Sequence, residues 1–93
     1  MDFIQDGNRF YMGENKDQPL AEITFEEKEN GRIVVDHTFT APSLRGQGIA
    51  RKLVERVADY AREGGFKLLA TCPYAQKVLS EDAFNNVYVS SVE

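Results

Sequence analysis

The chain has 93 residues, of which 42% are hydrophobic and 28% are charged, and its formal net charge at pH 7 is −4. This length predicts a single domain with a compact core over residues 1–93, and no segment has a composition typical of disorder. An acidic chain repels the phosphates of nucleic acids, which argues against DNA or RNA binding. The N-terminus lacks the basic and apolar blocks of a signal peptide, and no apolar run approaches the length of a membrane span. We therefore expect a cytoplasmic protein that binds neither nucleic acid nor a membrane.

The sequence holds one cysteine, Cys72, and one histidine, His37. A single cysteine cannot form an intramolecular disulfide, which is typical of a protein from a reducing compartment. Since there is no cluster of cysteines and histidines with metal-ligand spacing, we expect no metal site.

The N-terminal part predicts a short hairpin followed by a loop. Residues 3–5 and 9–12 flank Asp6-Gly7, a pair that tolerates the positive φ of a tight turn. Residues 13–19 are polar, which favours a loop.

Two longer antiparallel strands are predicted next. Apolar and polar residues alternate over residues 21–26, which is the period of a strand with one face on the core. The pair Asn30-Gly31 favours a second tight turn, and residues 32–40 are rich in β-branched side chains. Pro42 cannot donate to a sheet ladder and so helps to end this strand.

An amphipathic helix is predicted from Gln47 or Gly48 to the glycine pair at residues 64–65, which supplies a stop. Its apolar stripe is formed by Ile49, Leu53, Val57 and Ala61. Opposite charges on its outer face are spaced for two ion pairs, Arg51 with Glu55 and Asp59 with Arg62.

The C-terminal part predicts a strand, a short helix and a further extended segment. Residues 66–71 are mostly apolar, which is typical of a buried parallel strand, and they complete a βαβ unit over residues 33–71. Cys72-Pro73 is typical of a helix start, and this helix extends to Leu79 or Ser80. Residues 84–92 favour a final strand or extended segment. The predicted fold class is therefore α/β, with a mixed and mostly antiparallel sheet, a central βαβ unit and a short C-terminal helix.

His37 is expected on one strand face with Ile33, Val35 and Phe39, whereas Asp36 points to the opposite face. Asp36 therefore cannot orient the imidazole. Such a histidine is either a core residue, or it faces a ligand cleft as the general base for an incoming amine or as a partner of Cys72. We also expect five phenylalanines in the core: Phe3, Phe10, Phe25, Phe39 and Phe66.

The loop before the helix contains Gly46 and Gly48 in the run RGQGIA. A dinucleotide fingerprint needs a small residue where this chain has Arg51, and a P-loop needs a Lys-Ser/Thr pair that does not follow. What remains is a glycine loop at a helix N-terminus, whose free N–H groups bind anions, with Arg45 adding positive charge. The alternative is that the glycines only form a turn before the helix.

The loop and its neighbours resemble a known family. The run Arg45-Gly46-Gln47-Gly48-Ile49-Ala50 resembles the R/Q-x-x-G-x-G/A signature of the GNAT superfamily of acetyltransferases. Residues 40–46 are similar to the segment that leaves the fourth strand in that family. Residues 36–38, 44–50, 60–62 and 71–74 extend the likeness to the small YjdJ-type acetyltransferase-like proteins, which contain little beyond the acetyl-CoA-binding core. Larger members continue past the short helix into a region that shapes the acceptor pocket, and this sequence lacks most of that region.

The resemblance implies a minimal GNAT-like fold, acetyl-CoA as cofactor and an amine as acceptor. It assigns binding of the pyrophosphate to the loop, and the cofactor residues are Arg45, Gly46, Gln47, Gly48, Ile49, Ala50 and Arg51. Backbone N–H groups near Phe39 are then expected to polarise the thioester carbonyl. For Arg51 the alternative is a solvated position on the helix surface.

Cys72 should lie, by strand order, near the point where the acetyl group ends in the resembled fold. A thiol at a helix N-terminus is in a setting that favours a reactive thiolate. It could accept the acetyl group or protonate the departing CoA sulfur, and the alternative is a small buried hydrophobe. Tyr74 is similar to the tyrosine that many GNAT enzymes use as a general acid after the fifth strand; alternatively its ring packs on the sheet.

Three functions therefore remain open from the sequence. The first is transfer of acetyl to an amine, directly or through Cys72. The second is a non-catalytic acyl-CoA sensor or binding module, and the third is a partner-binding domain with a degenerate loop. The open edges of so small a sheet are compatible with a monomer or a weak dimer.

Overall fold

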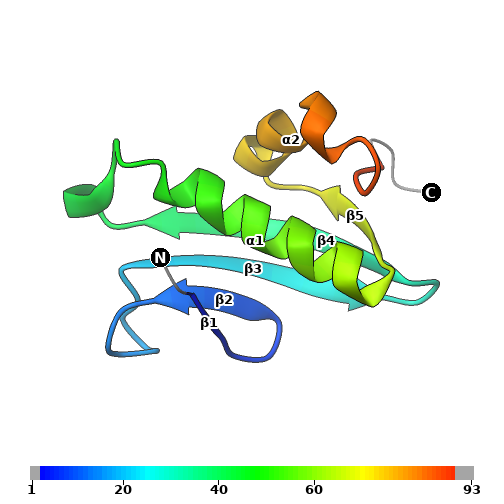
Figure 1. Ribbon diagram of the computed structural model, residues 1–93. Coiled ribbons are helices and arrows are strands. Elements are labelled where there is room, and N and C mark those ends of the chain that lie inside the picture. The colour runs from blue at the N-terminus through cyan, green and yellow to red at the C-terminus, as the bar shows by residue number, and fades with distance from the viewer. Residues whose placement is uncertain (1–2, 90–93) are drawn as a thin grey trace.

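The computed structural model describes residues 3–89, which form one sheet packed against helices (Figure 1). The strands are β1 (Ile4–Gln5), β2 (Arg9–Met12), β3 (Ala21–Lys28), β4 (Arg32–Thr40) and β5 (Lys67–Ala70). The helices are α1 (Ile49–Gly64) and α2 (Pro73–Leu79), with the short 3-10 helices η1 (Pro42–Leu44) and η2 (Asp82–Phe84). The strands lie in chain order, antiparallel from β1 to β4, and β5 is parallel to β4. The predicted mixed sheet, βαβ unit and short C-terminal helix are confirmed.

Both predicted hairpins are confirmed, and the β3–β4 turn shows why its sequence matters. Asn30 has φ +71 and Gly31 has φ +70, so both central residues are left-handed. Such a turn matches the right-handed twist of the flanking strands, and asparagine and glycine adopt it at the lowest cost.

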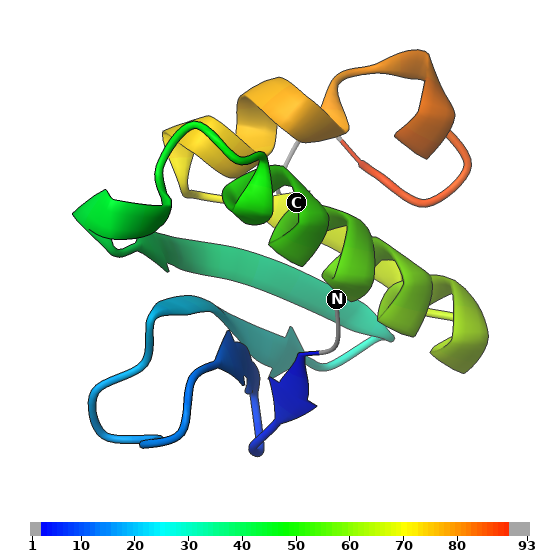
Figure 2. The same ribbon diagram turned by 60° about the vertical axis from the view of Figure 1, so that its left-hand side comes forward.

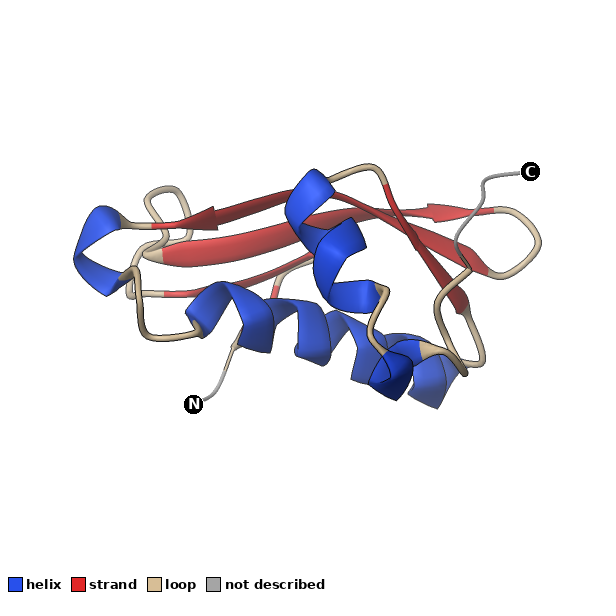
Figure 3. Ribbon diagram, turned by 90° about the horizontal axis from the view of Figure 1, so that it is seen from above, coloured by secondary structure: helices blue, strands red, loops and turns tan. Residues whose placement is uncertain are grey.

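The helices cover one face of the sheet, which we call the helix face, and the other side is the open face (Figure 3). The buried residues of α1 are Ile49, Leu53, Val54, Val57, Ala58 and Ala61. They share one core with sheet residues that include Phe10, Ala21, Ile23, Phe25, Ile33 and Val35. Burial of each large apolar side chain contributes about 1.5–3 kcal/mol, so this layer contact stabilises the fold.

The predicted ends of α1 are confirmed within a residue or two. Gly48 caps the N-terminus, and the helix ends at Gly64. The N–H of Gly65 donates to the carbonyl of Arg62 at 3.3 Å, and the N–H of Phe66 donates to that of Ala61 at 2.8 Å. This bond pair is the Schellman motif, which satisfies the last helical carbonyls.

A β-bulge interrupts the pairing of β3 with β4. Phe25 pairs with Val35 and Thr24 pairs with His37, so Asp36 is an extra residue on β4. Because side chains alternate between the two faces with a period of two, one extra residue exchanges the faces of everything that follows it.

Beyond the bulge, the threonines of β4 therefore lie on the helix face. Thr38 is opposite Ile23, and Thr40 is opposite Ala21. Both partners on β3 are fully buried, and directly paired residues share a face.

The expectation that His37 and Phe39 share an apolar face with the core is wrong. His37 pairs with Thr24 across the β3–β4 ladder, and Phe39 pairs with Glu22. Both pairs lie on the open face. His37 is exposed, and Phe39 is 37% exposed. Asp36 is on the open face as well, since its carboxylate accepts a hydrogen bond from the Thr24 hydroxyl. The bulge is the physical cause of these differences.

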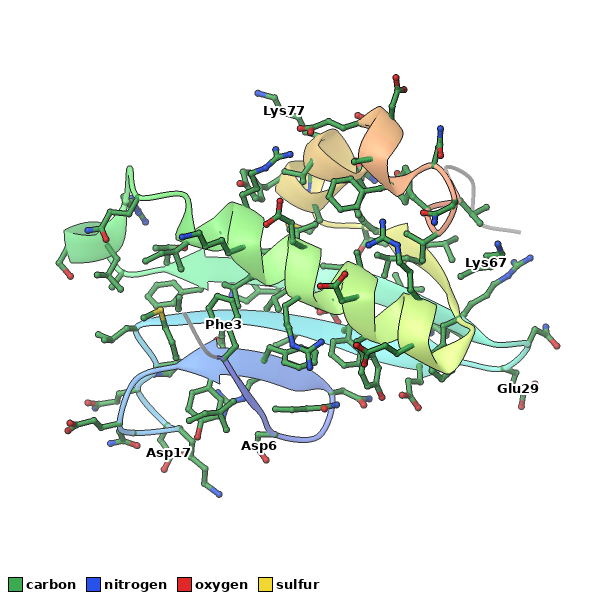
Figure 4. All side chains as sticks on the ribbon, viewed as in Figure 1. Phe3, Asp6, Asp17, Glu29, Lys67 and Lys77 are labelled. Atoms are coloured by element: carbon green, nitrogen blue, oxygen red, sulfur yellow. The ribbon has the colours of Figure 1, made fainter. Side chains whose placement is uncertain are left out.

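The other phenylalanines expected in the core contribute to it to different degrees. Phe10 and Phe25 are buried, and Phe3 and Phe66 are half-buried against the core. Figure 4 shows Phe3 lying inward, whereas the labelled acidic side chains Asp6, Asp17 and Glu29 point outward.

The prediction of an extended segment over residues 84–92 is largely wrong where the chain is described. Phe84 is buried and ends η2, and its carbonyl accepts the N–H groups of Val87 and Tyr88 at 3.0 and 2.8 Å, which closes a turn. Tyr88 forms a single parallel bridge with Leu68. Residues 90–92 lie outside the described residues.

Candidate functional site

The loop that joins β4 to α1 is built around two left-handed glycines. Gly46 has φ +86, and Gly48, the N-cap of α1, has φ +75. A Cβ at either position would meet no atom within 4 Å, so the backbone conformation and not crowding requires glycine there. The space in front of the loop is therefore open to a ligand.

The N-terminus of α1 has no acceptor from its own sequence. Gly48 provides no side-chain cap, and the first turn contains no acidic residue. The first N–H groups of a helix lack intrahelical partners and carry a partial positive charge. An anion in front of the loop would accept hydrogen bonds from these N–H groups and would be attracted by the partial positive charge.

A cleft of about 220 Å³ opens at this helix end. It is lined by Thr40, Leu44, Arg45, Gly46, Gly48, Ile49, Ala50 and Tyr74. The structure therefore brings Arg45, most of the predicted loop and Tyr74 together. Gln47 is an exposed residue of the same loop.

Arg45 is held at the wall of this cleft. Its Nε donates to the carbonyl oxygen of Thr40 at 3.3 Å, and its side chain is otherwise exposed. The positive charge therefore lies at the end of β4, next to the glycines.

Arg51 takes a different position from the one expected for a phosphate ligand. Its Nη1 donates to Glu81 at 2.8 Å as part of a bidentate pair, and its Nε lies 3.5 Å from Glu55. The hydrogen bonds to Glu81 raise the pKa of Arg51 and lower the pKa of Glu81. Arg51 thus ties the start of α1 to the segment after α2, and it does not line the cleft.

The strands β4 and β5 separate at Val35. Their register ends with Val35 opposite Ala70, and the carbonyl of Val35 then accepts the N–H groups of Thr71 and Cys72 at 2.9 and 3.4 Å. After this point β5 gives way to α2, whereas β4 continues through residues 36–40 with no β5 partner in the described part of the chain (Figure 2). A strand edge with free backbone groups therefore leads from the bulge to the glycine loop.

Cys72 lies at the inner end of this edge. It is the N-cap of α2, is half-buried against the core, and its Sγ is 3.6 Å from the Thr38 Oγ1. Either atom of this contact can be the donor. Two roles of Cys72 are compatible with this position. Its side chain could serve only as a small apolar group that packs against the core, or its thiol could be approached by a ligand that extends from the cleft.

The structure does not bring His37 to Cys72. Neighbouring strand residues point to opposite faces, and Thr38 contacts Cys72 on the helix face, so the imidazole of His37 points away from the thiol. His37 and Cys72 thus flank the same stretch of β4 from two sides.

Tyr74 lies in the cleft wall and is 39% exposed. Partial burial raises the pKa of Tyr74 above its ordinary value, and the nearby Arg51 opposes this shift. The phenol therefore remains protonated at neutral pH and can donate a hydrogen bond or a proton.

Thr40 is a cleft residue that the sequence did not reveal. Its hydroxyl oxygen is buried, and no hydrogen-bond partner for it exists among residues 3–89. A buried polar atom without a partner costs about 1–3 kcal/mol. The sequence places Thr40 at the end of a strand and at the start of the segment, residues 40–46, that is similar to the GNAT segment after the fourth strand. The face of its side chain was hidden because the bulge reverses the alternation.

Two kinds of feature are absent from residues 3–89. Nowhere in that range do three or more His, Cys, Asp or Glu side chains gather as a metal site would require. None of the helices there combines the length and apolarity needed to cross a membrane.

Comparison with solved structures gives the class of fold. A GCN5-like protein from Staphylococcus aureus, assigned as an N-acetyltransferase and solved by NMR, is 36% identical with a TM-score of 0.82, and the alignment covers 99% of this chain and 91% of that one. Ribosomal-protein-alanine N-acetyltransferase from Brucella melitensis biovar Abortus 2308 is 21% identical with a TM-score of 0.59, covering 94% and 68%. Aminoglycoside N-acetyltransferase AAC(6')-Iy, in complex with CoA, is 19% identical with a TM-score of 0.54, covering 91% and 61%. The last two likenesses concern the fold alone.

A family model identifies the family to which the chain belongs. Residues 9–87 match the model described as GCN5-related N-acetyl-transferase. The chain therefore belongs to the GCN5-related N-acetyltransferase family, and the GNAT resemblance of the sequence is confirmed. A comparison with curated proteins gave no match.

The ion pair of Arg51 with Glu81 predicts a pH-dependent contribution to stability. Because the folded-state pKa of Glu81 is lowered, the contribution is complete above the ordinary glutamate pKa of about 4.3 and is lost as the pH falls through the lower folded value. We expect Arg51→Gln to lower the melting temperature at pH 7, and this difference from the unmodified protein should vanish at strongly acidic pH.

Lys52→Gln is the matched control, since it removes the same charge from the next residue of α1, and none of the ion pairs within residues 3–89 uses Lys52. Thermal melts followed by circular dichroism at several pH values measure the effect. A difference for Arg51→Gln that stays constant with pH, or that equals that of Lys52→Gln, would contradict the assignment.

Proposed function

We propose that this chain binds acetyl-CoA and transfers its acetyl group to an amine, with the N–H groups of residues 47–50 on the pyrophosphate. The proposal rests on one arrangement of the site. The glycine loop lines a cleft at the N-terminus of α1, which has no side-chain cap, and the free edge of β4 leads from this cleft to Cys72. Membership of the GCN5-related family and the CoA bound to a relative of similar fold support acyl-CoA as the ligand.

The phosphate end of the ligand is bound by backbone groups. The left-handed Gly46 and Gly48 turn the loop, and the absence of side chains at these positions lets a pyrophosphate approach the amides closely. Arg45 adds a fixed positive charge at the cleft wall. Arg51 supports the site indirectly, since its guanidinium is bound to Glu81.

The acyl end of the ligand lies in the gap between β4 and β5. Residues 36–40 have backbone groups on the side that β5 vacates, and N–H groups near Phe39 polarise the thioester carbonyl. The carbonyl oxygen gains negative charge as it is attacked, so these donors stabilise the transition state more than the ground state.

Two routes for the acetyl group are compatible with this geometry. In the direct route the amine nitrogen attacks the thioester carbon, the carbon–sulfur bond breaks, and the CoA sulfur takes a proton from Cys72 or Tyr74. In the covalent route the Cys72 thiolate attacks the same carbon and releases CoA. The amine then cleaves the acetyl-Cys72 thioester and regenerates the thiol.

His37 suits the role of general base for an amine that arrives at the open face. His37 is exposed, lies next to the bulge on that face, and is not part of a row of apolar side chains. The unprotonated imidazole nitrogen can take the proton that the amine loses on attack. Tyr74, protonated at neutral pH, is the second candidate for the proton donor to sulfur.

The second candidate function is a non-catalytic acyl-CoA sensor or binding module. The half-buried packing of Cys72 against the core favours it, because a purely structural thiol needs no reactive role. The glycine loop and cleft act identically in both functions. The acceptor, a cytoplasmic location, a monomeric or weakly dimeric state and membership of the YjdJ-type subgroup remain predictions.

Gly48→Glu tests the phosphate loop. The carboxylate would enter the open space in front of the N–H groups and repel an anion there, so we expect CoA binding to be abolished in isothermal titration calorimetry. Gly7→Glu is the control, since Gly7 also has a positive φ of +59 with no atom within 4 Å of a built Cβ, but lies in the β1–β2 turn. Circular dichroism verifies that both variants fold. CoA affinity that is unchanged in folded Gly48→Glu would contradict the loop assignment.

Cys72→Ala separates the two routes of acetyl transfer. Under the covalent route, incubation with acetyl-CoA adds the mass of one acetyl group to the unmodified protein and none to Cys72→Ala, as measured by intact mass spectrometry. Turnover of amine acceptors should then be lost in the variant. If Cys72→Ala retains full turnover, the covalent route is excluded and direct transfer remains.

A further inference from the structure

The hydroxyl of Thr40 has no role in the fold that the structure describes. Thr40 ends β4 on the helix face, and its Oγ1 is shielded from solvent without a hydrogen-bond partner among residues 3–89. Its main-chain oxygen is used, since it accepts from Arg45. A valine would fill the same volume with no unmet hydrogen bond, so folding alone gives no reason for a hydroxyl here.

The position of Thr40 along the site limits which part of a ligand it can meet. Thr38, two residues earlier on the same face, contacts Cys72, which marks the acyl end. Gly46 and Gly48, which line the cleft together with Thr40, mark the phosphate end. A strand advances about 3.3 Å per residue, so the side chains of Thr38 and Thr40 are separated by roughly 7 Å. Thr40 therefore stands between the two ends.

We propose that the Thr40 hydroxyl is a binding contact for the neutral arm of acyl-CoA that joins the pyrophosphate to the thioester. The inference rests on the proposed function. This arm carries amide and hydroxyl groups but no charge, and a hydroxyl that can both donate and accept is a suitable hydrogen-bond partner for either group. Thr40 lines the cleft, and a rotation about χ1 moves its hydroxyl to another staggered position, from which it can meet this arm.

The test compares two ligands and two variants by isothermal titration calorimetry. CoA contains the arm, and adenosine 3′-phosphate 5′-diphosphate contains the pyrophosphate without it. We expect Thr40→Val to bind CoA about 3- to 10-fold more weakly, the range of one neutral hydrogen bond, and to bind the adenosine ligand as tightly as the unmodified protein does. Thr40→Ser keeps the hydroxyl and should retain CoA affinity. The melting temperature of ligand-free Thr40→Val should equal or exceed that of the unmodified protein.

Each contrary outcome has a distinct meaning. Equal CoA affinity in Thr40→Val and the unmodified protein would overturn the contact. An equal loss for both ligands would overturn the assignment to the neutral arm, because it would implicate the phosphate end. A fall in the melting temperature of ligand-free Thr40→Val would overturn the claim that the hydroxyl is unused in the fold. Absence of CoA binding by the unmodified protein would overturn the proposed function itself, and this inference with it.

Discussion

The separation of two strands at the carbonyl of Val35 determines the arrangement of the whole site. This oxygen accepts the N–H groups of Thr71 and Cys72, and the pairing of β4 with β5 ends there. The bulge at Asp36 follows directly and reverses the faces of β4. Because of these two adjacent features, a strand edge with free backbone groups, a thiol and two threonine side chains all lie along one path to the glycine loop.

The elements of the fold could be predicted because each has a local cause in the sequence. Asn30-Gly31 favours a left-handed turn, the stripe from Ile49 to Ala61 favours a helix, and Pro73 favours a helix start. The glycine loop before α1 could be located for the same reason, since two closely spaced glycines before an apolar stripe are a local pattern.

The features that were missed depend on contacts between distant parts of the chain. Nothing in the run around Asp36 indicates a bulge, so the faces of His37 and Phe39 were predicted wrongly, and the buried, unpartnered hydroxyl of Thr40 was not foreseen. The partner of Arg51 is Glu81, far along the chain, and the local spacing revealed only Glu55. A pattern of residue types predicts elements, whereas register and pairing follow from packing.

The two sides of β4 divide the proposed chemistry. The helix face holds the cleft, the helix N-terminus and Cys72, all suited to an anionic ligand with a thioester. The open face presents His37 and Asp36 and, in the described part of the chain, is not covered by a helix. An acceptor that approaches from the open face would meet the acyl group through the gap between β4 and β5, without displacing the cofactor.

The proposed function requires that an acyl-CoA occupies the path from the glycine loop to Cys72. Its most direct test is a titration of acetyl-CoA into isotopically labelled protein, followed through the backbone amide chemical shifts. We expect the largest shifts over residues 45–51, continuing along residues 36–40 to Cys72, while the β1–β2 hairpin is unaffected. Absence of shifts at the loop, or shifts confined to the open face, would contradict it.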